Sequence, residues 1–143
     1  MIVGDLNLLL YAVNEDAIQH ARARTWWEHC LSEGESVGLA WSVILGFVRL
    51  TTNPRIMPRP LSPEDAFAVV DGWLDQPSVR TIEPTERHWP LLKELLTPLG
   101  SAGNLTSDAH LAALTIEHGA QLFSTDNDFA RFFGLRWRNP LAR

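Results

Sequence analysis

Aspartates in three separated segments of the chain stand where they could hold a metal ion. Asp5 closes a short apolar run at the start of the sequence, Asp108 follows a glycine-containing loop, and Asp126 and Asp128 follow another apolar run. Clustered carboxylates repel one another and take up protons unless a cation neutralises them, and hard oxygen ligands suit Mg²⁺ or Mn²⁺. If the fold joins these segments, their residue types predict a divalent metal site.

Other polar residues lie beside these aspartates in the sequence. Asn7, Ser107 and Thr125 could orient the carboxylates or water bound near them. Each has a competing interpretation as a local cap, and each aspartate taken alone is also consistent with a turn former, a first-turn acid or an N-cap. The metal interpretation therefore depends on the segments meeting at one place.

Other common kinds of active site lack support in the sequence. The five histidines match no HExxH pattern, and we expect most of them on helix surfaces. The only cysteine, Cys30, can form neither an intramolecular disulfide nor a cysteine-based zinc site. No P-loop, dinucleotide-binding or GxSxG motif is present. These observations argue against zinc enzymes, nucleotide hydrolases, Rossmann dehydrogenases and serine hydrolases.

The charge balance limits how this protein could meet nucleic acid. Twelve cations against 17 acids give a net charge of −5, which argues against a surface that binds polyanions over a whole face. Lys93 is the only lysine, and the arginines that make up the remaining cations suit bidentate phosphate contacts. Local phosphate sites are therefore compatible with the acidic composition.

Strand-like runs alternate with helical patterns along the chain, and this alternation would position the aspartates. We expect strands over 1–4, 36–40, 79–82 and 121–124, and helices over 6–13, 20–32, 41–50, 62–75, 86–99, 107–118 and 128–133. Ser62 is the expected N-cap of one helix, and Thr106 or Ser107 of another. The pattern predicts a three-layer α/β/α sandwich with a central, mainly parallel sheet. Ligands of such sheets bind at the carboxyl ends of the strands, where the aspartates stand.

The size of the chain fits a single domain covering 1–143. Its 143 residues, of which 45% are hydrophobic, can bury one core. The first residues carry no basic region, and Asp5 and Asn7 interrupt their apolar stretch, so we expect neither a signal peptide nor a membrane span. A single cysteine fits a reducing compartment, and we expect the protein in the cytoplasm.

The three aspartate segments carry a family resemblance that spans nearly the whole chain. VGDLNLLLYAVN, GNLTSDAHLAAL and STDNDFARFFGLRWRNPL together resemble a PIN-domain protein of the VapC toxin family. The inner segments WSVILGFVRLTTNPR and RPLS are similar to the branch of that family abundant in mycobacteria.

This resemblance implies a PIN-like fold and the toxin component of a type II toxin-antitoxin system. Such a toxin is an endoribonuclease that depends on Mg²⁺ or Mn²⁺, is inhibited by a cognate VapB-type antitoxin and is usually a homodimer. The acidic site residues of the family match Asp5, Asp108 and Asp126, with Asp128 as a further carboxylate for the metal. The commonest family pattern also has a glutamate in the third helix, where this chain has Gly46.

Three functions stay open at the level of the sequence. The favoured one is a ribonuclease in which Mg²⁺ activates water for in-line attack on a phosphodiester, with Arg49 and Arg131 as candidates for holding the RNA backbone. The alternatives are a weakly active or inactive PIN scaffold that binds RNA or its antitoxin, and a metal-dependent phosphatase. Trp26, Trp27 and Trp41 are the aromatic residues expected to offer a partner surface.

Overall fold

The computed structural model describes residues 1–142, and a five-stranded parallel sheet forms its centre. Along the sheet the strands follow the order β3-β2-β1-β4-β5, so β1 lies in the middle. The strands are β1 (Ile2–Gly4), β2 (Val37–Ala40), β3 (Val79–Ile82), β4 (Gln121–Phe123) and β5 (Trp137–Arg138). All four residues of β2 are buried, as expected for a strand covered on both faces.

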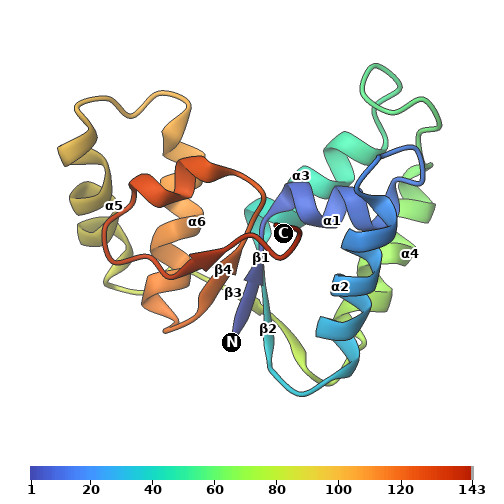
Figure 1. Cartoon of the computed structure of the whole chain (residues 1–143), viewed down its shortest axis with the longest axis horizontal. Coiled ribbons are helices and arrows are strands. Elements are labelled where there is room, and N and C mark those ends of the chain that lie inside the picture. Colours follow the sequence, from blue (N-terminus) through green and yellow to red (C-terminus); the bar gives the residue numbers. More distant parts are fainter. Residues whose placement is uncertain (143) are drawn as a thin grey trace.

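Helices cover both faces of this sheet (Figure 1). One face carries α1 (Leu6–Val13), α2 (His20–Ser32), α3 (Trp41–Thr51) and α4 (Pro63–Leu74), and the other carries α5 (His88–Leu96) and α6 (Leu105–Glu117). The connections from β1 to β2 and from β2 to β3 run over the first face, whereas the connection from β3 to β4 returns over the second. The predicted three-layer α/β/α sandwich is confirmed.

This change of direction creates a switch point between β1 and β4. The chain leaves β1 toward α1 on the first face, whereas it enters neighbouring β4 from α6 on the second face, and ligands of such sheets bind at a switch point of this kind. Within residues 1–142, no helix combines the length and the apolar character that crossing a membrane would need.

Local signals explain where several helices begin and end. The Ser62 hydroxyl accepts a hydrogen bond from the backbone N–H of Asp65, and Pro63 occupies the first position of α4, as predicted. Gly119 adopts a positive φ of 61° just after α6, a conformation that glycine adopts without steric cost. These residues fix the start of α4 and the end of α6.

Other expected boundaries were wrong. Helix α6 begins at Leu105, and its cap residue Asn104 makes no side-chain hydrogen bond, so neither Thr106 nor Ser107 is the cap. The helix expected over 86–99 begins at His88 and ends in a short 3₁₀ turn. The last expected helix is a 3₁₀ turn, η2 (Asn127–Arg131), and β5 was not predicted.

The aromatic residues divide between core and surface differently from what was expected. Trp27 is buried and packs edge-on against Trp73, so it offers no partner surface. Trp26 is half-buried and packs beside Trp27 and Phe123, and its ring centroid lies 5.5 Å from that of Phe123. Only Trp41 of the three is largely exposed.

Two of the histidines expected on helix surfaces are part of a half-buried polar network instead. His88 contacts Glu117 through Nδ1 and lies 2.9 Å from Nδ1 of His110 through Nε2. Glu117 also accepts hydrogen bonds from the backbone N–H and the hydroxyl of Thr85. The network joins the start of α5 to the end of α6, on the side of the sheet away from α1.

Candidate functional site

Asp5 stands where the first strand turns into the first helix, at the switch point. Its backbone N–H donates to the carbonyl oxygen of Phe123 in β4 at 2.9 Å, so the residue is fixed to the neighbouring strand. Its Oδ1 accepts from the backbone N–H of Leu6 at 2.8 Å and caps α1. The positive end of the helix dipole therefore faces this carboxylate.

Ser124 connects Asp5 to the next aspartate along the edge. Its hydroxyl is fully buried, donates to Oδ2 of Asp5 at 2.7 Å and accepts from the backbone N–H of Asp126 at 3.0 Å. Sequence reasoning missed this residue and named its neighbour Thr125. Ser124 follows β4 and is buried like Leu122 two positions before it, but a serine after a strand does not by itself indicate such a contact.

Three further carboxylates meet beside Asp5. Asp108 lies in the first turn of α6, and Asp126 caps η2 by accepting from the backbone N–H of Asp128 at 2.8 Å. One carboxylate oxygen from each of Asp108, Asp126 and Asp128 lies within 4.8 Å of the others. The structure thus brings all four predicted aspartates to one edge of the sheet and places Asp128 within the tight group.

The electrostatics of this group reflect burial and like charge. Burial raises the pKa of Asp5, although the hydrogen bonds from Ser124 and Leu6 oppose the shift and Asp126 adds to it. Burial, followed by the charges of Asp5, Asp126 and Asp128, raises the pKa of Asp108 to about 6. These carboxylates therefore repel one another when all are ionised, and a cation would relieve that repulsion.

The donor set suits a hard divalent ion. Oxygen ligands of Mg²⁺ at about 2.1 Å lie up to about 4.2 Å apart across the ion, slightly less than the 4.8 Å limit on the group of three. Carboxylates without a sulfur or imidazole ligand favour Mg²⁺ or Mn²⁺ over zinc.

The remaining residues predicted to support the site are not joined to it. Asn7 and Ser107 are exposed, Thr125 is half-buried, and within residues 1–142 none of these side chains hydrogen-bonds a site carboxylate. Arg49 and Arg131 are exposed and form no ion pair within the described residues. Their roles stay predictions.

Gly46 packs against the residue that follows Asp5. It is buried in α3, and a Cβ atom at this position would lie 2.6 Å from Cδ2 of Leu6. Real Cβ atoms do not approach so closely, so any side chain here would displace Leu6. The glycine at this position, where the family commonly has a glutamate, therefore allows α3 to pack closely against Leu6 of α1.

Comparison with known proteins gives the same assignment at the levels of family, sequence and fold. The model of the PIN domain matches residues 2–134. Ribonuclease VapC37 of Mycobacterium tuberculosis is 46% identical over 142 residues, which cover 99% of this chain and 99% of that protein. Ribonuclease VapC33 of the same organism is 43% identical over 141 residues, again covering 99% of both.

A solved structure shares the fold at low sequence identity. The structure of VapBC2 from Rickettsia felis bound to a DNA fragment from its promoter superimposes with a TM-score of 0.71 and 17% identity, covering 97% of this chain and 98% of that chain. The sequence match of over 40% across nearly the full length is the stronger finding. The chain belongs to the PIN-domain family and, within it, to the VapC ribonucleases.

Proposed function

We propose that this protein is the toxin of a toxin-antitoxin pair and cuts RNA with the help of Mg²⁺ or Mn²⁺. The observation that carries the proposal is the group of three carboxylates of Asp108, Asp126 and Asp128 at the switch point, where burial and the charges of Asp5 and its neighbours raise the pKa of Asp108 to about 6. Such a site is poorly suited to a metal-free protein at neutral pH. Its relatives VapC37 and VapC33 are named ribonucleases.

Each residue of the site has a role in this proposal. Asp5, Asp108, Asp126 and Asp128 hold the metal, and Ser124 keeps the Asp5 carboxylate turned toward it. A divalent ion bound there lowers the pKa of water and neutralises charge on a phosphate under attack. Arg49 and Arg131 hold the RNA backbone, since their guanidinium groups are exposed and form no ion pair within residues 1–142.

The expected partners follow from the same assignment. The Rickettsia felis relative is a VapBC pair, and we expect a VapB-type antitoxin to inhibit this chain in the cytoplasm, where its RNA substrate lies. Trp41 and Leu45 lie four residues apart on α3 and are 46% and 64% exposed, which supports a protein contact such as a homodimer interface. Light scattering of the purified protein tests the homodimer.

Cleavage assays with purified protein test the proposed activity. We expect RNA cleavage in Mn²⁺ or Mg²⁺ that stops with a chelator and falls at least about a hundredfold in Asp5→Asn and Asp108→Asn. Asp71→Asn, which changes an exposed aspartate on α4, is the matched control and should cut normally.

The same assays separate the alternatives. Binding of RNA or antitoxin without cleavage in either metal would instead support the inactive scaffold, for which the missing glutamate at Gly46 is the reason. Release of phosphate from a monoester, with intact RNA, would support the phosphatase. Wild-type cleavage rates in both aspartate variants would contradict the metal-site assignment.

A further inference from the structure

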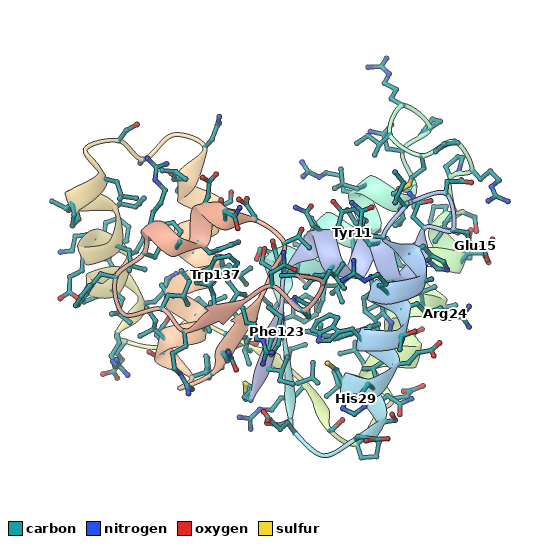
Figure 2. The ribbon with its side chains drawn as sticks, in the orientation of Figure 1. Tyr11, Glu15, Arg24, His29, Phe123 and Trp137 are labelled. Carbon is teal, nitrogen blue, oxygen red and sulfur yellow. The ribbon has the colours of Figure 1, made fainter. Side chains whose placement is uncertain are left out.

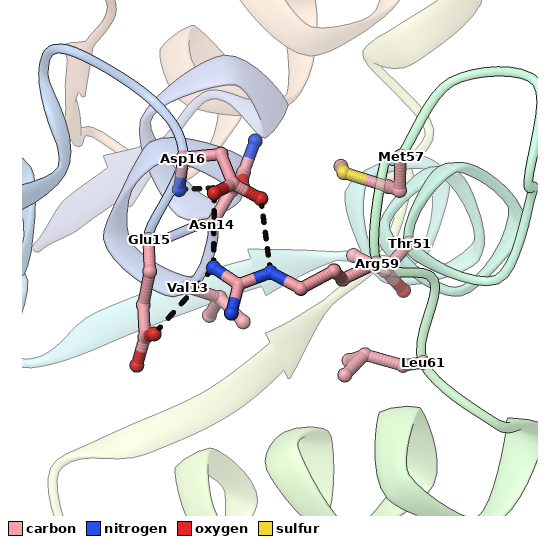
Figure 3. A pocket seen from close by; sticks show the side chains of 8 residues that line it. All are labelled: Val13, Asn14, Glu15, Asp16, Thr51, Met57, Arg59 and Leu61. Atoms are coloured by element: carbon pink, nitrogen blue, oxygen red, sulfur yellow. Dashed lines mark hydrogen bonds and ion pairs between the residues drawn. The ribbon is translucent and has the colours of Figure 1, made fainter.

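A concave site lies beyond the far end of α1, outside the carboxylate cluster. It is a pocket of about 260 Å³ between the residues after α1 and the proline-rich loop after α3 (Figure 3). Val13, Met57 and Leu61 form its apolar lining. At about 30 Å³ per water molecule, this volume holds on the order of nine waters, which is room for a flat aromatic ring system.

Backbone hydrogen bonds hold the loop that forms one wall of the pocket. The N–H groups of Ile56 and Met57 both donate to the carbonyl oxygen of Asn53, at 3.0 and 2.9 Å. The N–H of Leu61 donates to the carbonyl oxygen of Thr51 at 2.8 Å, which closes the loop back onto the end of α3. The wall is therefore formed before any ligand arrives, which lowers the cost of ordering on binding.

The opposite wall is fixed in the same way. The N–H of Asn14 donates to the carbonyl oxygen of Leu10 at the end of α1, and Oδ1 of Asn14 accepts from the N–H of Asp16 at 3.0 Å. The carboxamide NH₂ of Asn14 makes no hydrogen bond within residues 1–142. A donor is thus available beside the apolar lining.

An arginine and an aspartate face each other across the mouth of this pocket. Nη2 of Arg59 donates to Oδ1 of Asp16 at 2.9 Å, and Nε donates to Oδ2 at 3.3 Å (Figure 3). Their side chains are 68% and 40% exposed, so the pair contributes little to folding and can exchange partners readily. The guanidinium offers two parallel donors, and the carboxylate offers two parallel acceptors.

One nucleobase matches both groups. Guanine presents the O6 and N7 acceptors that pair with an arginine fork, and its N1–H and N2–H donors match a carboxylate. Its flat faces suit an apolar lining such as that of Met57 and Leu61. Adenine and uracil have neither of these two paired edges, and cytosine lacks the paired donors.

The pocket lies within reach of an RNA strand bound at the carboxylates. Asp5 caps the start of α1 and the pocket begins at Val13, so the eight residues of α1 separate them by about 12 Å. In Figure 2, Tyr11 and then Glu15 follow α1 away from the sheet toward the pocket. A stacked strand rises by about 3.4 Å per nucleotide, which places the pocket within about four nucleotides of the scissile phosphate.

We propose that this pocket holds one unstacked guanine of the RNA substrate and thereby selects where the strand is cut, an inference that rests on the proposed ribonuclease function. Arg59 and Asp16 separate from each other and contact the two edges of the base, and Met57 and Leu61 contact its face. The phosphates stay outside the pocket, where the acidic side chains of Glu15 and Asp16 would repel them.

A protein ligand fits these groups less well. A protein side chain that paired with Arg59 would be a carboxylate, which the carboxylates of Asp16 and Glu15 would repel. A side chain that paired with Asp16 would be a cation, which the guanidinium of Arg59 would repel. A neutral base with separate donor and acceptor edges avoids both repulsions. The observations therefore favour RNA over an inhibitor segment.

The first experiment maps cleavage in a pool of short RNAs of random sequence with purified protein and Mn²⁺. Sequencing of the new 5′ ends should show guanine enriched at one position within about four nucleotides of the cut. Arg59→Ala and Asp16→Asn should lose this enrichment and still cut the pool. The control Arg55→Ala removes an exposed arginine from the same loop, outside the pocket, and should keep the enrichment.

The second experiment couples the base to the pocket. A short RNA with guanine at the enriched position is compared with the same RNA carrying an abasic site there. We expect the abasic site to slow cleavage by the wild-type protein about tenfold. Arg59→Ala should slow cleavage of the guanine RNA by a similar factor. Arg59→Ala should cut the abasic RNA no more slowly than it cuts the guanine RNA. Arg55→Ala should leave the tenfold difference intact.

The outcomes distinguish failure of this proposal from failure of the proposed function. Cleavage that depends on Asp5 but shows no guanine enrichment, or enrichment that survives in Arg59→Ala, overturns the pocket assignment alone. Loss of antitoxin affinity in Arg59→Ala with unchanged enrichment would assign the pocket to the protein partner and also overturns it. No Asp5-dependent cleavage by the wild-type protein overturns both.

Discussion

Among single residues, Asp108 should make the metal-free protein sensitive to pH. Its folded pKa of about 6 lies above the ordinary value of 3.8, so the folded state binds more protons than the unfolded chain between these values. Stability from this residue is complete below about pH 3.8 and is lost as the pH rises through about 6. Asp108→Asn should therefore melt at an increasingly higher temperature than the wild type as the pH is raised from 4 to 7.

Thermal melts in a chelator, at closely spaced pH values, measure this difference. It should level off above about pH 6. A difference between Asp108→Asn and the wild type that stays constant from pH 4 to 7 would contradict the assigned environment of Asp108.

Ser124 should matter for metal affinity through its contact with Asp5. Ser124→Ala removes the hydroxyl that donates to Oδ2 of Asp5, which frees the carboxylate to turn and raises its pKa further. Loss of such an orienting partner lowers metal affinity by about 10-fold to 100-fold in other sites, and we expect a decrease of about tenfold here. Titration calorimetry with Mn²⁺ measures it, and Thr125→Val, which makes no such contact, should bind Mn²⁺ like the wild type.

Gly46 should resist replacement because of Leu6. Gly46→Glu forces the Leu6 side chain out of its position, and such overpacking costs about 1–3 kcal/mol, partly offset by a gain in helix propensity of up to about 1 kcal/mol. Leu6→Ala should make room, so the double variant should be more stable than the sum of the single changes predicts. Urea melts give the free energies. Additive effects would show that the two side chains do not compete for space.

The same pair of variants separates the two explanations for this glycine. If Gly46 stands where a lost metal ligand once was, Mn²⁺ binding should tighten in the double variant, in which a glutamate has space to reach toward Asp5. Unchanged Mn²⁺ affinity would leave packing between α3 and α1 as the reason for the glycine.

Between elements, the polar network of Glu117 should hold α5 on α6. The cap residue of α5, Arg87, makes no side-chain cap, and the Glu117 carboxylate accepts instead from Thr85 just before the helix. Its side chain is fully buried, so Glu117→Gln, which loses charge-assisted hydrogen bonds, should cost about 1–3 kcal/mol. The exposed Glu94 on α5 is the control, and Glu94→Gln should cost less than about 0.5 kcal/mol.

The stability that Glu117 contributes should depend on pH. Burial alone would raise the pKa of Glu117, but the hydrogen bonds from Thr85 and His88 outweigh burial and lower it below the ordinary value of 4.5. Its stabilisation is complete above pH 4.5 and is lost as the pH falls through the lower folded pKa. The stabilities of the wild type and Glu117→Gln should therefore approach each other as the pH is lowered below 4.5, and a gap that does not narrow in acid would contradict this.

The sequence predicted most elements because their signals are local. Ser62 with Pro63 marked the start of α4, and the apolar runs before Asp5 and Asp126 marked two neighbouring strands. Two-residue β5 has too few residues for a periodic pattern, and its pairing with β4 depends on the whole sheet. The start of α6 was misplaced because Asn104 carries no capping hydrogen bond.

At the scale of the whole molecule, metal binding should appear as thermal stabilisation. An ion that binds only the folded state adds about 2.7 kcal/mol at a hundred times its Kd, or a rise in Tm of several degrees for a chain of this size. We expect this rise with Mn²⁺ or Mg²⁺, its reversal by a chelator and its loss in Asp5→Asn. An equal rise in Asp5→Asn would place the bound ion elsewhere.

The sequence predicted the aspartates of the site from their positions at strand ends, but it did not predict the contacts made by Ser124 and Arg59. The aspartates stood at strand ends, so a parallel sheet was enough to gather them. The Ser124 contact with Asp5 spans 119 positions, and the Arg59 contact with Asp16 spans 43, so both depend on how distant loops meet in three dimensions. Neither residue type has a sequence signature for such a contact.

The central place of β1 in the sheet sets when during translation the site can form. Asp5 leaves the ribosome before β2, which can then cover one side of β1, whereas the other side stays uncovered until β4 and the aspartates that follow it have been made. A nascent chain released short of residue 121 lacks Ser124, Asp126 and Asp128 together. Prematurely ended products of this reading frame should therefore be harmless to the cell that makes them, whatever the length of the fragment up to that point.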